Sequence, residues 1–273
     1  MISCFISGRL GNQLFIVFMI IAYSLKYNID YTFLYPQKDN NWDVAFRYIK
    51  HKTINKLPRI HIRYREKTFH YTELPKFDLN KNILMYGYYQ SYKYFLEYYD
   101  KIYDILKIEE HINELKKKID IHLKNYTSIH FRIGDYINTN GAFPVLPLSY
   151  YINCIKELIQ KKKKDNLNFM IFCEKQDIDI VSKHICELKK IYPNCNFKIL
   201  SHEYNAWETI LIMSMCNDNI IANSSFSWWG AYLNKNKEKI ILYPSLWFNK
   251  EEPNFKNYNY KDLCPNSWVK INI

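Results

Sequence analysis

The sequence predicts an α/β protein with two domains, each built on a parallel sheet with helices on its faces. The chain has 273 residues and is 48% hydrophobic, which is enough for one large domain or two ordinary ones with full cores. In its second half, strand-like runs alternate with helix-like segments of about 10–15 residues, a pattern typical of parallel sheets. The chain also opens with a strand, a glycine-containing loop and a helix.

The first half of the chain is expected to begin with a strand, a loop and a helix. Ile2 to Ile6 is expected to form a short buried strand, followed by a loop over 7–12 and a helix from about Gln13 to Tyr27. The further elements expected here are a strand over 31–35, a variable and partly helical stretch over 40–56, a strand over 83–86, and helices over 92–106 and 109–124.

The apolar run from Leu14 to Leu25 raises the question of a membrane anchor. Its 12 residues are too few to span a bilayer. Arg9 is the only basic residue before it, and no small-residue cleavage site follows. We therefore expect a buried first helix rather than a signal anchor, and a cytoplasmic protein without a transmembrane segment.

A change of composition near 124–127 predicts a domain boundary, with an N-terminal domain over 1–124 and a C-terminal domain over 125–273. The expected strands of the second domain cover 128–132, 168–173, 196–200, 219–222 and 239–243. The expected helices between them cover 148–162, 177–188, 207–216 and 226–234.

The formal net charge of +11 suits an anionic partner, such as a nucleic acid, a membrane surface or a small anion. An AT-rich coding sequence, which favours lysine, explains the charge equally well. No zinc-finger spacing or RNA-recognition signature accompanies it, so we expect no nucleic-acid partner. The seven cysteines are scattered without a Cys-x-x-Cys pair, which fits reduced thiols in the cytosol.

Four of the six glycines lie in three short polar motifs. Gly8 and Gly11 belong to the segment 7–15, Gly134 to 130–136 and Gly230 to 223–230. Glycine is needed where a backbone turns sharply or approaches a ligand closely. Each motif follows a strand-like run and adds arginine, asparagine, serine or histidine, which indicates a site for a phosphorylated ligand.

The second motif, His-Phe-Arg-Ile-Gly-Asp-Tyr, places Phe131 on one face of its strand and His130 and Arg132 on the other. Arg132 then lies at the carboxyl end of a parallel strand, where open α/β sheets bind ligands. Its guanidinium is suited to two phosphate oxygens. The alternative is an ion pair between Arg132 and Asp135 that braces the turn.

The third motif, Asn-Ser-Ser-Phe-Ser from Asn223, joins a buried strand to a helix. Its serines cap that helix, and the same helix N-terminus is suited to an anion. Trp228 and Trp229 are expected to pack against the sheet.

The first motif, Gly-Arg-Leu-Gly-Asn-Gln from Gly8, is neither a Walker loop nor Gly-x-Gly-x-x-Gly. By itself it is equally consistent with a tight turn and with an anion loop.

Taken together, the blocks Gly-Arg-Leu-Gly-Asn-Gln-Leu-Phe, His-Phe-Arg-Ile-Gly-Asp-Tyr and Asn-Ser-Ser-Phe-Ser-Trp-Trp-Gly-Ala-Tyr-Leu resemble signature blocks of glycosyltransferase family 11, the α-1,2-fucosyltransferases. The resemblance extends to 87–95, 145–151 and 211–216, in family order from residue 7 to about 233.

This resemblance implies a GT-B fold of two Rossmann-like domains facing a central cleft. It implies GDP-fucose as donor, a glycan or glycoprotein acceptor, often a terminal galactoside, inversion at the anomeric carbon, and no metal or other cofactor. By motif match, Arg132 would bind the donor diphosphate. The other residues expected to bind the donor are Gly8, Arg9, Asn12, Gln13, His130, Asn223, Ser224, Ser225 and Phe226.

Two positions depart from the family pattern. Ile133 stands where the family block has a second arginine, as it does in the more distantly related protein O-fucosyltransferases. The family's Phe-Ser-Asp-Asp block appears as Phe172 to Lys175, and Glu174 is expected to accept hydrogen bonds from a guanine edge.

In such a transfer a hydroxyl attacks the anomeric carbon as GDP leaves through an oxocarbenium-like state. Fixed positive groups aimed at the leaving diphosphate lower the barrier. The hydroxyl also needs a general base, for which Asp135 is the first candidate and His130 the second. The alternative role for Asp135 is to orient Arg132.

Three other interpretations stay open. Asp177-Ile178-Asp179 spells the metal-binding triplet of many GT-A glycosyltransferases, although two acids also suit the first turn of a helix. The chain also fits a glycosyltransferase that uses another nucleotide sugar, or a sugar-binding protein with a decayed site.

Overall fold

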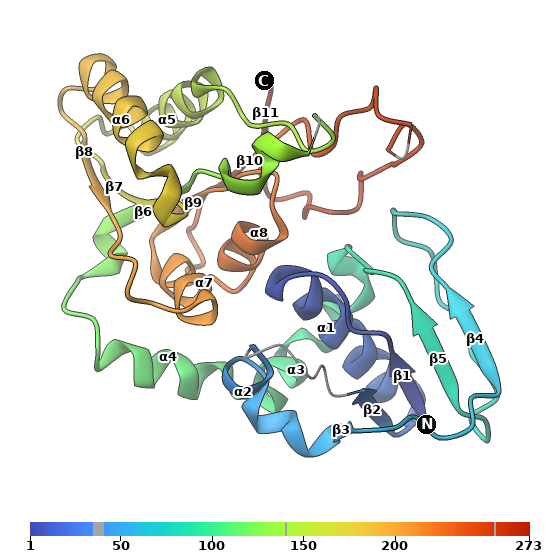
Figure 1. Ribbon diagram of the computed structural model, residues 1–273. Coiled ribbons are helices and arrows are strands. Elements are labelled where there is room, and N and C mark those ends of the chain that lie inside the picture. The colour runs from blue at the N-terminus through green and yellow to red at the C-terminus, as the bar shows by residue number, and fades with distance from the viewer. Residues whose placement is uncertain (35–40, 140, 254) are drawn as a thin grey trace. The chain divides into compact units, whose positions relative to one another are not determined.

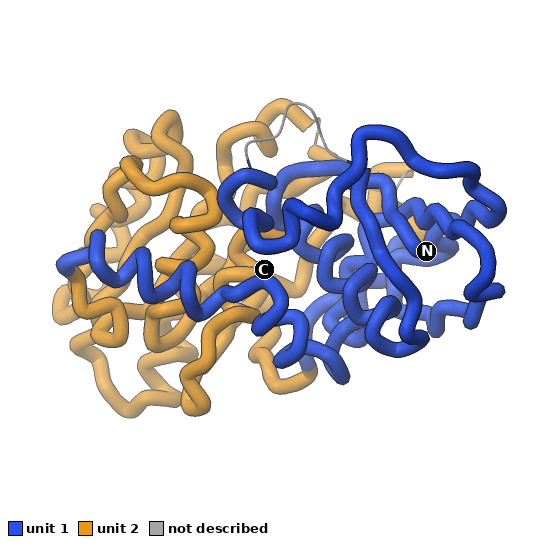
Figure 2. Tube along the Cα trace, turned by 90° about the horizontal axis from the view of Figure 1, so that it is seen from below, with its two compact units in different colours: residues 1–120, 258–265 blue, residues 121–257, 266–273 orange. Residues whose placement is uncertain are grey.

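The computed structural model describes residues 1–34, 41–139, 141–253 and 255–273. The chain divides into two compact units (Figure 2). The first unit comprises Met1–Asp120 and Tyr258–Pro265, and the second comprises Ile121–Asn257 and Asn266–Ile273. The sequence prediction had placed all of 258–265 in the second domain, whereas this segment packs with the first unit.

The first unit is built on a parallel sheet with the strand order β3-β2-β1-β5-β4 in the part of the chain that the structure describes (Figure 1). β1 (Ile2–Cys4) is central and pairs with β2 (Tyr31–Leu34) and β5 (Ile83–Tyr86). β3 (Thr53–Ile54) and β4 (Ile62–Arg65) form the edges. The strands expected near 2–6, 31–35 and 83–86 are present, although residue 35 lies outside the described residues.

The helix α1 (Leu10–Tyr27) forms the core of the first unit. It starts three residues earlier than expected, directly after Arg9. Its length and hydropathy would also suit a membrane span, but 72% of its apolar window is buried inside the protein. Its burial on nearly all sides explains why its sequence is apolar almost all round.

The other helices of the first unit are shorter than expected. The segment expected to be one helix over 92–106 is divided into two short 3₁₀ turns and a helix, and the last helix ends at Lys116 instead of residue 124. Lys107 takes a left-handed conformation, with φ of 51°, which separates the last two helices. The elements, in order, are α2 (Asn41–Val44), η1 (Arg47–Lys52), η2 (Tyr92–Tyr94), η3 (Leu96–Tyr98), α3 (Tyr99–Ile105) and α4 (Ile108–Lys116). The partly helical stretch expected over 40–56 is described from residue 41 onward.

The second unit has a parallel sheet with the order β11-β10-β9-β6-β7-β8 among the described residues. If the six strands of this unit are numbered along the chain from β6, their order across the sheet, starting at β8, is 3-2-1-4-5-6. This is the strand order of the Rossmann fold. The expectation of an α/β protein with two Rossmann-like units is therefore confirmed. Its strands are β6 (Tyr126–His130), β7 (Asn168–Phe172), β8 (Asn196–Ile199), β9 (Asp218–Ile220), β10 (Ile241–Pro244) and β11 (Val269–Ile271), of which β11 was not expected.

The helices of the second unit follow the expected alternation closely. They are η4 (Leu123–Asn125), η5 (Gly134–Asn138), α5 (Leu148–Lys162), η6 (Lys175–Asp177), α6 (Ile178–Ile191), α7 (Ala206–Met215) and α8 (Ser225–Tyr232).

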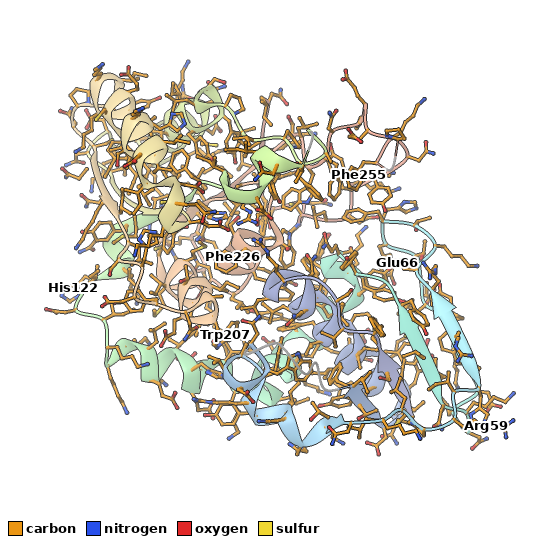
Figure 3. All side chains as sticks on the ribbon, in the orientation of Figure 1. Arg59, Glu66, His122, Trp207, Phe226 and Phe255 are labelled. Atoms are coloured by element: carbon orange, nitrogen blue, oxygen red, sulfur yellow. The ribbon has the colours of Figure 1, made fainter. Side chains whose placement is uncertain are left out.

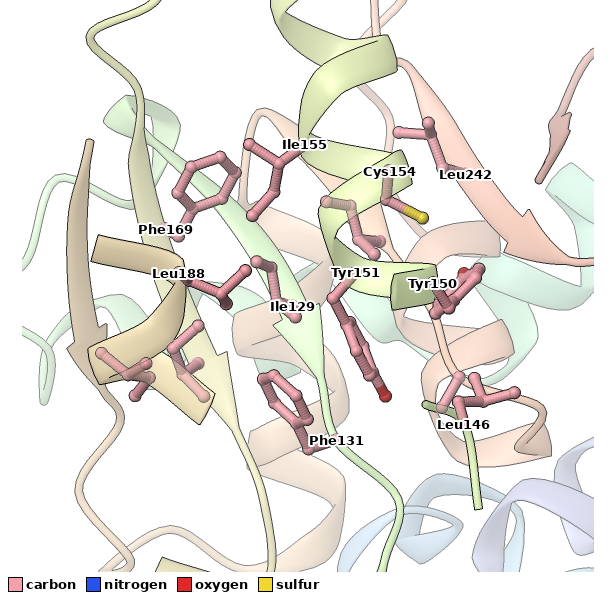
Figure 4. Packing of buried hydrophobic residues seen from close by; sticks show 14 of the residues in the cluster. Ile129, Phe131, Leu146, Tyr150, Tyr151, Cys154, Ile155, Phe169, Leu188 and Leu242 are labelled. Atoms are coloured by element: carbon pink, nitrogen blue, oxygen red, sulfur yellow. The ribbon is translucent and has the colours of Figure 1, made fainter. Parts of the chain in front are cut away.

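A hydrophobic core lies between the sheet and the helices α5 and α6 (Figure 4). Ile129 and Phe131, which flank His130 in the chain, both belong to this core. The ring of Phe131 lies 4.1 Å from that of Tyr151 on α5. This packing fixes which way alternate side chains leave the end of β6.

The helices α7 and α8 pack so closely that they need a glycine. A Cβ atom added to Gly230 would lie 2.6 Å from Cβ of Met213. Trp228 and Trp229 are fully buried in the same unit, as expected. Gly230 thus serves the close packing of α7 and α8.

We expect Gly230→Ala to destabilise the second unit by about 1–2 kcal/mol. Overpacking costs about 1–3 kcal/mol, and the better helix propensity of alanine returns about 1 kcal/mol at most. Urea unfolding followed by tryptophan fluorescence measures this, because Trp228 and Trp229 lie in that unit. An unchanged or raised midpoint would contradict the close packing of α7 and α8.

Candidate active site

Two of the three sequence motifs meet where the strand order of the second unit reverses. β7 and β8 lie on one side of β6, and β9 to β11 lie on the other. The ring centroids of His130, at the end of β6, and Phe226, at the start of α8, are 5.7 Å apart. The hydroxyl of Tyr136 donates a 2.9 Å hydrogen bond to the carbonyl of Asn223. Ligands of open α/β sheets bind at this kind of switch point.

Arg132 is the charged side chain at the centre of this site. Its guanidinium donates to the carboxylates of both Asp135 and Glu174. The Cζ atom also lies 5.0 Å from the ring centroid of Tyr136. The ion pair with Asp135, which the sequence analysis left open as the alternative, is therefore present, and Glu174 is a second partner that the sequence did not predict. The side chain is only 11% exposed, and its Nε–H has no acceptor within the protein.

Gly134 allows the carboxylate of Glu174 to reach Arg132. A Cβ atom at Gly134 would overlap an oxygen of that carboxylate. The N–H of Gly134 donates to Asp177 at 2.9 Å, so the turn is fixed from a second side. Close approach is thus the reason for this glycine, as the sequence suggested, but the group that approaches belongs to the protein itself.

Asp177 and Asp179 occupy different environments. The carboxylate of Asp177 is buried, with 3% exposure, and accepts from the backbone of Gly134. Asp179 is exposed in the first turn of α6. This geometry fits the start of a helix better than a metal-binding triplet. No group of three His, Cys, Asp or Glu side chains with metal-binding geometry occurs over the described ranges.

His130 is held neutral by its surroundings. It is 95% buried, and burial, with a smaller effect from Arg132, lowers its pKa to about 3. Its Nδ1 atom has no hydrogen-bond partner within the protein. Buried polar atoms are rarely left unpaired in native proteins, so a ligand or water is expected at this atom. A histidine with so low a pKa is a weak general base and a better hydrogen-bonding group.

In the third motif, one residue holds neighbouring loops through its side-chain amide and the next caps a helix. The side-chain amide of Asn223 donates to the carbonyls of Pro144, at 2.9 Å, and Trp247, at 3.2 Å. Ser224 caps α8 by accepting from the N–H of Phe226 at 3.3 Å. Ser225 and Phe226 form the first turn of α8 and are partly exposed. The first two residues therefore shape this loop, while the next two are accessible to a ligand.

The N-terminal motif occupies the equivalent place in the first unit. Gly8 has a φ of +76°, and its carbonyl accepts from the side chain of Gln13 at 2.9 Å. Asn12, in the first turn of α1, accepts from Gln90 at 2.8 Å, which joins the start of α1 to the segment after β5. β1 and β5 are neighbours where the strand order of this sheet reverses. Arg9 is exposed at the start of α1.

Glu66 is a residue of this sheet edge that the sequence analysis missed. It follows β4, and its carboxylate accepts from the N–H groups of Tyr88, at 2.8 Å, and Tyr89, at 3.1 Å. Burial raises its pKa to about 7. A single acid after the alternating run Ile62–Arg65 was the available signal, but that run was not recognised as a strand.

Comparison with known proteins identifies the family of this chain. The family model described as glycosyl transferase family 11 matches residues 41–272. The chain belongs to glycosyltransferase family 11. It is 31% identical over 252 residues to an alpha-1,2-colitosyltransferase of Escherichia coli, covering 90% of this chain and 81% of that protein. It is 29% identical over 205 residues to the O-antigen biosynthesis glycosyltransferase WbnK of Escherichia coli, covering 72% of this chain and 63% of that protein.

Among solved structures, a mutant of Arabidopsis thaliana FUT1 in complex with GDP overlaps with a TM-score of 0.48 at 11% identity. The overlap covers 89% of this chain and 70% of that chain.

Ile133, the position of the second arginine in the resembled family block, lies in the hydrophobic core. It is 5% exposed and packs with Ile129 and Phe131. An arginine with this orientation would bury an unpaired charge, which is costly. The second unit is therefore adapted to a single arginine, Arg132, at this turn.

The neutral state of His130 predicts a pH dependence of stability. In the unfolded chain a histidine binds a proton near pH 6.5, whereas folded His130 does so only near pH 3. The stability that this difference contributes is complete above pH 6.5 and is lost as the pH falls. At pH 4 the loss reaches at most about 3 kcal/mol.

We expect His130→Asn to flatten the decline in stability between pH 6.5 and pH 4, as measured by urea unfolding of the second unit. The shifted His111 of the first unit is present in both proteins and cancels in the comparison. His122, which is exposed (Figure 3), gives the matched control His122→Asn with an unaltered pH profile. Equal pH profiles for wild type and His130→Asn would contradict the neutral buried state.

Proposed function

We propose that this glycosyltransferase transfers L-fucose from GDP-fucose to a hydroxyl of a glycan or glycoprotein acceptor, with inversion and without a metal. The proposed product is an α-1,2 linkage to a terminal galactoside. The observation that carries the proposal is the convergence of the Arg132 turn and the Asn223–Phe226 loop at the switch point of a Rossmann-ordered sheet. The second motif supplies the charge for a diphosphate, and the third supplies a helix N-terminus.

Arg132 and α8 are the proposed anchors of the diphosphate. The Nε–H of Arg132 lacks an acceptor, and the N-terminus of α8 carries the positive end of its dipole. A phosphate oxygen has the same charge and hydrogen-bonding capacity as the carboxylates that now hold the guanidinium. We therefore propose that the diphosphate takes the place of Glu174, which reaches Arg132 from the end of β7, whereas Asp135 belongs to the same turn as Arg132.

The remaining donor contacts are also proposals. His130 would donate or accept one hydrogen bond in its neutral form, while Ser225 and Phe226 line the phosphate and the sugar. Glu174, once released from Arg132, would be available to a guanine edge. The further proposed donor contacts are Gly8, Arg9, Asn12, Gln13, Asn223 and Ser224.

In the chemical step, the protein must stabilise the negative charge that develops on the departing diphosphate. A preorganised guanidinium does this without reorganisation at the moment of reaction. Asp135 accepts a hydrogen bond from Arg132, so the geometry supports an orienting role for Asp135. Its role as the general base is the alternative.

A second donor is favoured by one specific finding. The colitosyltransferase is 31% identical over most of both chains. A colitosyl group carried by a nucleotide is therefore the second candidate substrate, with the same fold and the same diphosphate site.

A thermal-shift screen of the purified protein tests the donor. GDP, GDP-fucose, GDP-mannose, nucleotide-activated colitose, UDP-glucose, UDP-galactose and dTDP-sugars are compared with and without EDTA. A ligand at a hundred times its Kd adds about 2.7 kcal/mol of stability. We expect GDP and GDP-fucose to stabilise the protein equally with EDTA. Stronger stabilisation by another nucleotide would contradict GDP-fucose as the donor. Complete loss of the stabilisation in EDTA would contradict the metal-free mechanism.

We expect Arg132→Lys to weaken GDP binding about 10- to 100-fold, because a charge-assisted hydrogen bond is worth about 1.5–3 kcal/mol and lysine cannot form the same fork. Isothermal titration calorimetry measures the change. Arg59 is exposed in the first unit (Figure 3), so Arg59→Lys is the matched control with unchanged affinity. If Arg132→Lys bound GDP with wild-type affinity, the proposed contact between Arg132 and the diphosphate would be wrong.

We expect Asp135→Asn to lower turnover and GDP affinity together, because the amide holds Arg132 less well than the carboxylate. Initial rates and GDP titrations on the same preparation separate the two effects. A loss of turnover by about 10²–10⁴-fold with GDP binding intact would instead make Asp135 the general base.

A further inference from the structure

The edge strand β4 of the first unit carries basic side chains on one face. Arg63 and Arg65 on this strand are exposed, whereas Ile62 and Tyr64 are half-buried. The same alternation of exposed and half-buried residues continues beyond both ends of the strand, and Figure 3 shows Arg59 near one end of it. The exposed positions, here called the basic face, are Arg59, His61, Arg63, Arg65 and Lys67.

The cations of the basic face have no carboxylate partner. No ion pair to any of them occurs over the residues that the structure describes. Elsewhere in the same unit, Lys26 pairs with Glu73 and Arg47 with Glu114. The acid within the segment, Glu66, belongs by strand alternation to the opposite face and is held by backbone N–H groups. The positive charge of the basic face is therefore not neutralised by a contact within the protein.

An exposed aromatic ring adjoins the basic face. Arg65 lies beside Tyr86 of β5 in the strand register, and its Cζ atom is 5.9 Å from the centroid of that ring. The ring of Phe5, which follows β1, stacks on that of Tyr86 with centroids 6.2 Å apart. Phe5 is 51% exposed. A guanidinium and two rings thus form one row across three neighbouring strands, on the same face as Arg63.

This combination of groups suits an anionic lipid surface. Basic side chains are attracted to anionic headgroups, and a phenyl ring enters the interface without leaving a polar group unpaired. A site for single-stranded nucleic acid would need free rings on which successive bases stack. Within the row, Phe5 is the exposed ring, because Tyr86 is half-buried and contacts both Phe5 and Arg65. The net charge of +11 adds a long-range attraction to an anionic bilayer.

We propose that the basic face, together with Phe5, is a docking surface for an anionic phospholipid bilayer. Arg63 and Arg65 follow each other at about 7 Å along the strand, and each guanidinium is suited to the phosphate oxygens of a headgroup. Phe5 would enter the interface beside them. The association is peripheral and reversible, since it depends on a few charges and one ring, and it is independent of the donor site in the second unit.

The test is co-sedimentation of the whole 273-residue chain with sucrose-loaded vesicles. The vesicles consist of phosphatidylcholine alone or of phosphatidylcholine with about one-third phosphatidylglycerol. We expect binding to the anionic vesicles only, and loss of most of it in about 1 M NaCl, where the Debye length falls to about 3 Å. Equal binding to both kinds of vesicle, or no binding to either, would overturn the proposal.

The double variant Arg63→Gln/Arg65→Gln should bind the anionic vesicles about 30-fold less tightly, because each cation near such a surface contributes about fivefold. The matched control is Lys183→Gln/Lys189→Gln, which removes the same charge from exposed positions on α6 of the second unit. This control should bind as the wild type does. Equal losses in the two double variants would show that net charge alone attracts the protein, and would overturn the basic face as the docking surface.

Phe5→Ala should weaken binding to the anionic vesicles about 3- to 10-fold, because about half of a phenyl side chain is available for transfer out of water. The salt dependence should stay as in the wild type, since no charge is removed. Wild-type affinity in Phe5→Ala would exclude the ring from the docking surface. The melting temperature and the thermal shift with GDP should equal those of the wild type in every variant, which shows that each one is folded.

Two other roles of the basic face give different results. Charged side chains also keep an edge strand from pairing with another chain. In that case Arg63→Gln/Arg65→Gln would self-associate on size-exclusion chromatography while the wild type does not bind the vesicles. A nucleic-acid site would instead bind a single-stranded oligonucleotide more tightly than the anionic vesicles at physiological salt. Either result would overturn the proposed bilayer docking.

Discussion

The charge of Arg132 constrains most of the structure around the second switch point. A guanidinium with 11% exposure is costly unless it is paired, and here two carboxylates share it. Asp135 comes from the same turn and Glu174 from the end of the neighbouring strand β7. Gly134, without a side chain, leaves room for the carboxylate of Glu174 beside the guanidinium, and Asp177 accepts from the N–H of that glycine. One buried charge is thus surrounded by four other residues, two from its own motif and two from the segment after β7, and these form the arrangement that a diphosphate would meet.

The two units share the same arrangement at the point where the strand order of each sheet reverses. In each sheet the strand order reverses beside the first strand of the unit, β1 or β6. A glycine-containing segment follows that strand. In the first unit a hydrogen bond joins the start of α1 to the segment after β5, and in the second unit a ring contact joins the end of β6 to the start of α8. The difference lies in charge. The second unit presents a guanidinium with a helix N-terminus, whereas in the first unit backbone N–H groups hold the carboxylate of Glu66.

The parts of the fold that the sequence predicted are those with strong local signals. The helix α5 occupies the expected 148–162 because its apolar positions repeat with helical period, and the buried runs of β6 and β7 stand out in the same way. β3, β4 and β11 are short or half-exposed, so their pairing depends on neighbours that are distant in sequence. For the same reason Glu66 could not be found, since the N–H groups that hold its carboxylate belong to Tyr88 and Tyr89. The second partner of Arg132 was equally hidden, because 42 residues separate it from Glu174.

The contrast between the carboxylates bears on how the chemistry is divided. Asp135 and Glu174 accept hydrogen bonds from a guanidinium, so both carboxylates are engaged in holding Arg132. Glu66 has only backbone N–H donors at its carboxylate, and burial raises its pKa to about 7. His130, with a pKa lowered to about 3, stays neutral and gives up no binding energy to protonation near neutral pH. Environments that separate titratable groups in this way mark acid–base assignments in enzymes. The paired carboxylates, the partly buried carboxylate of Glu66 and the neutral imidazole of His130 therefore differ in the chemistry that each can perform.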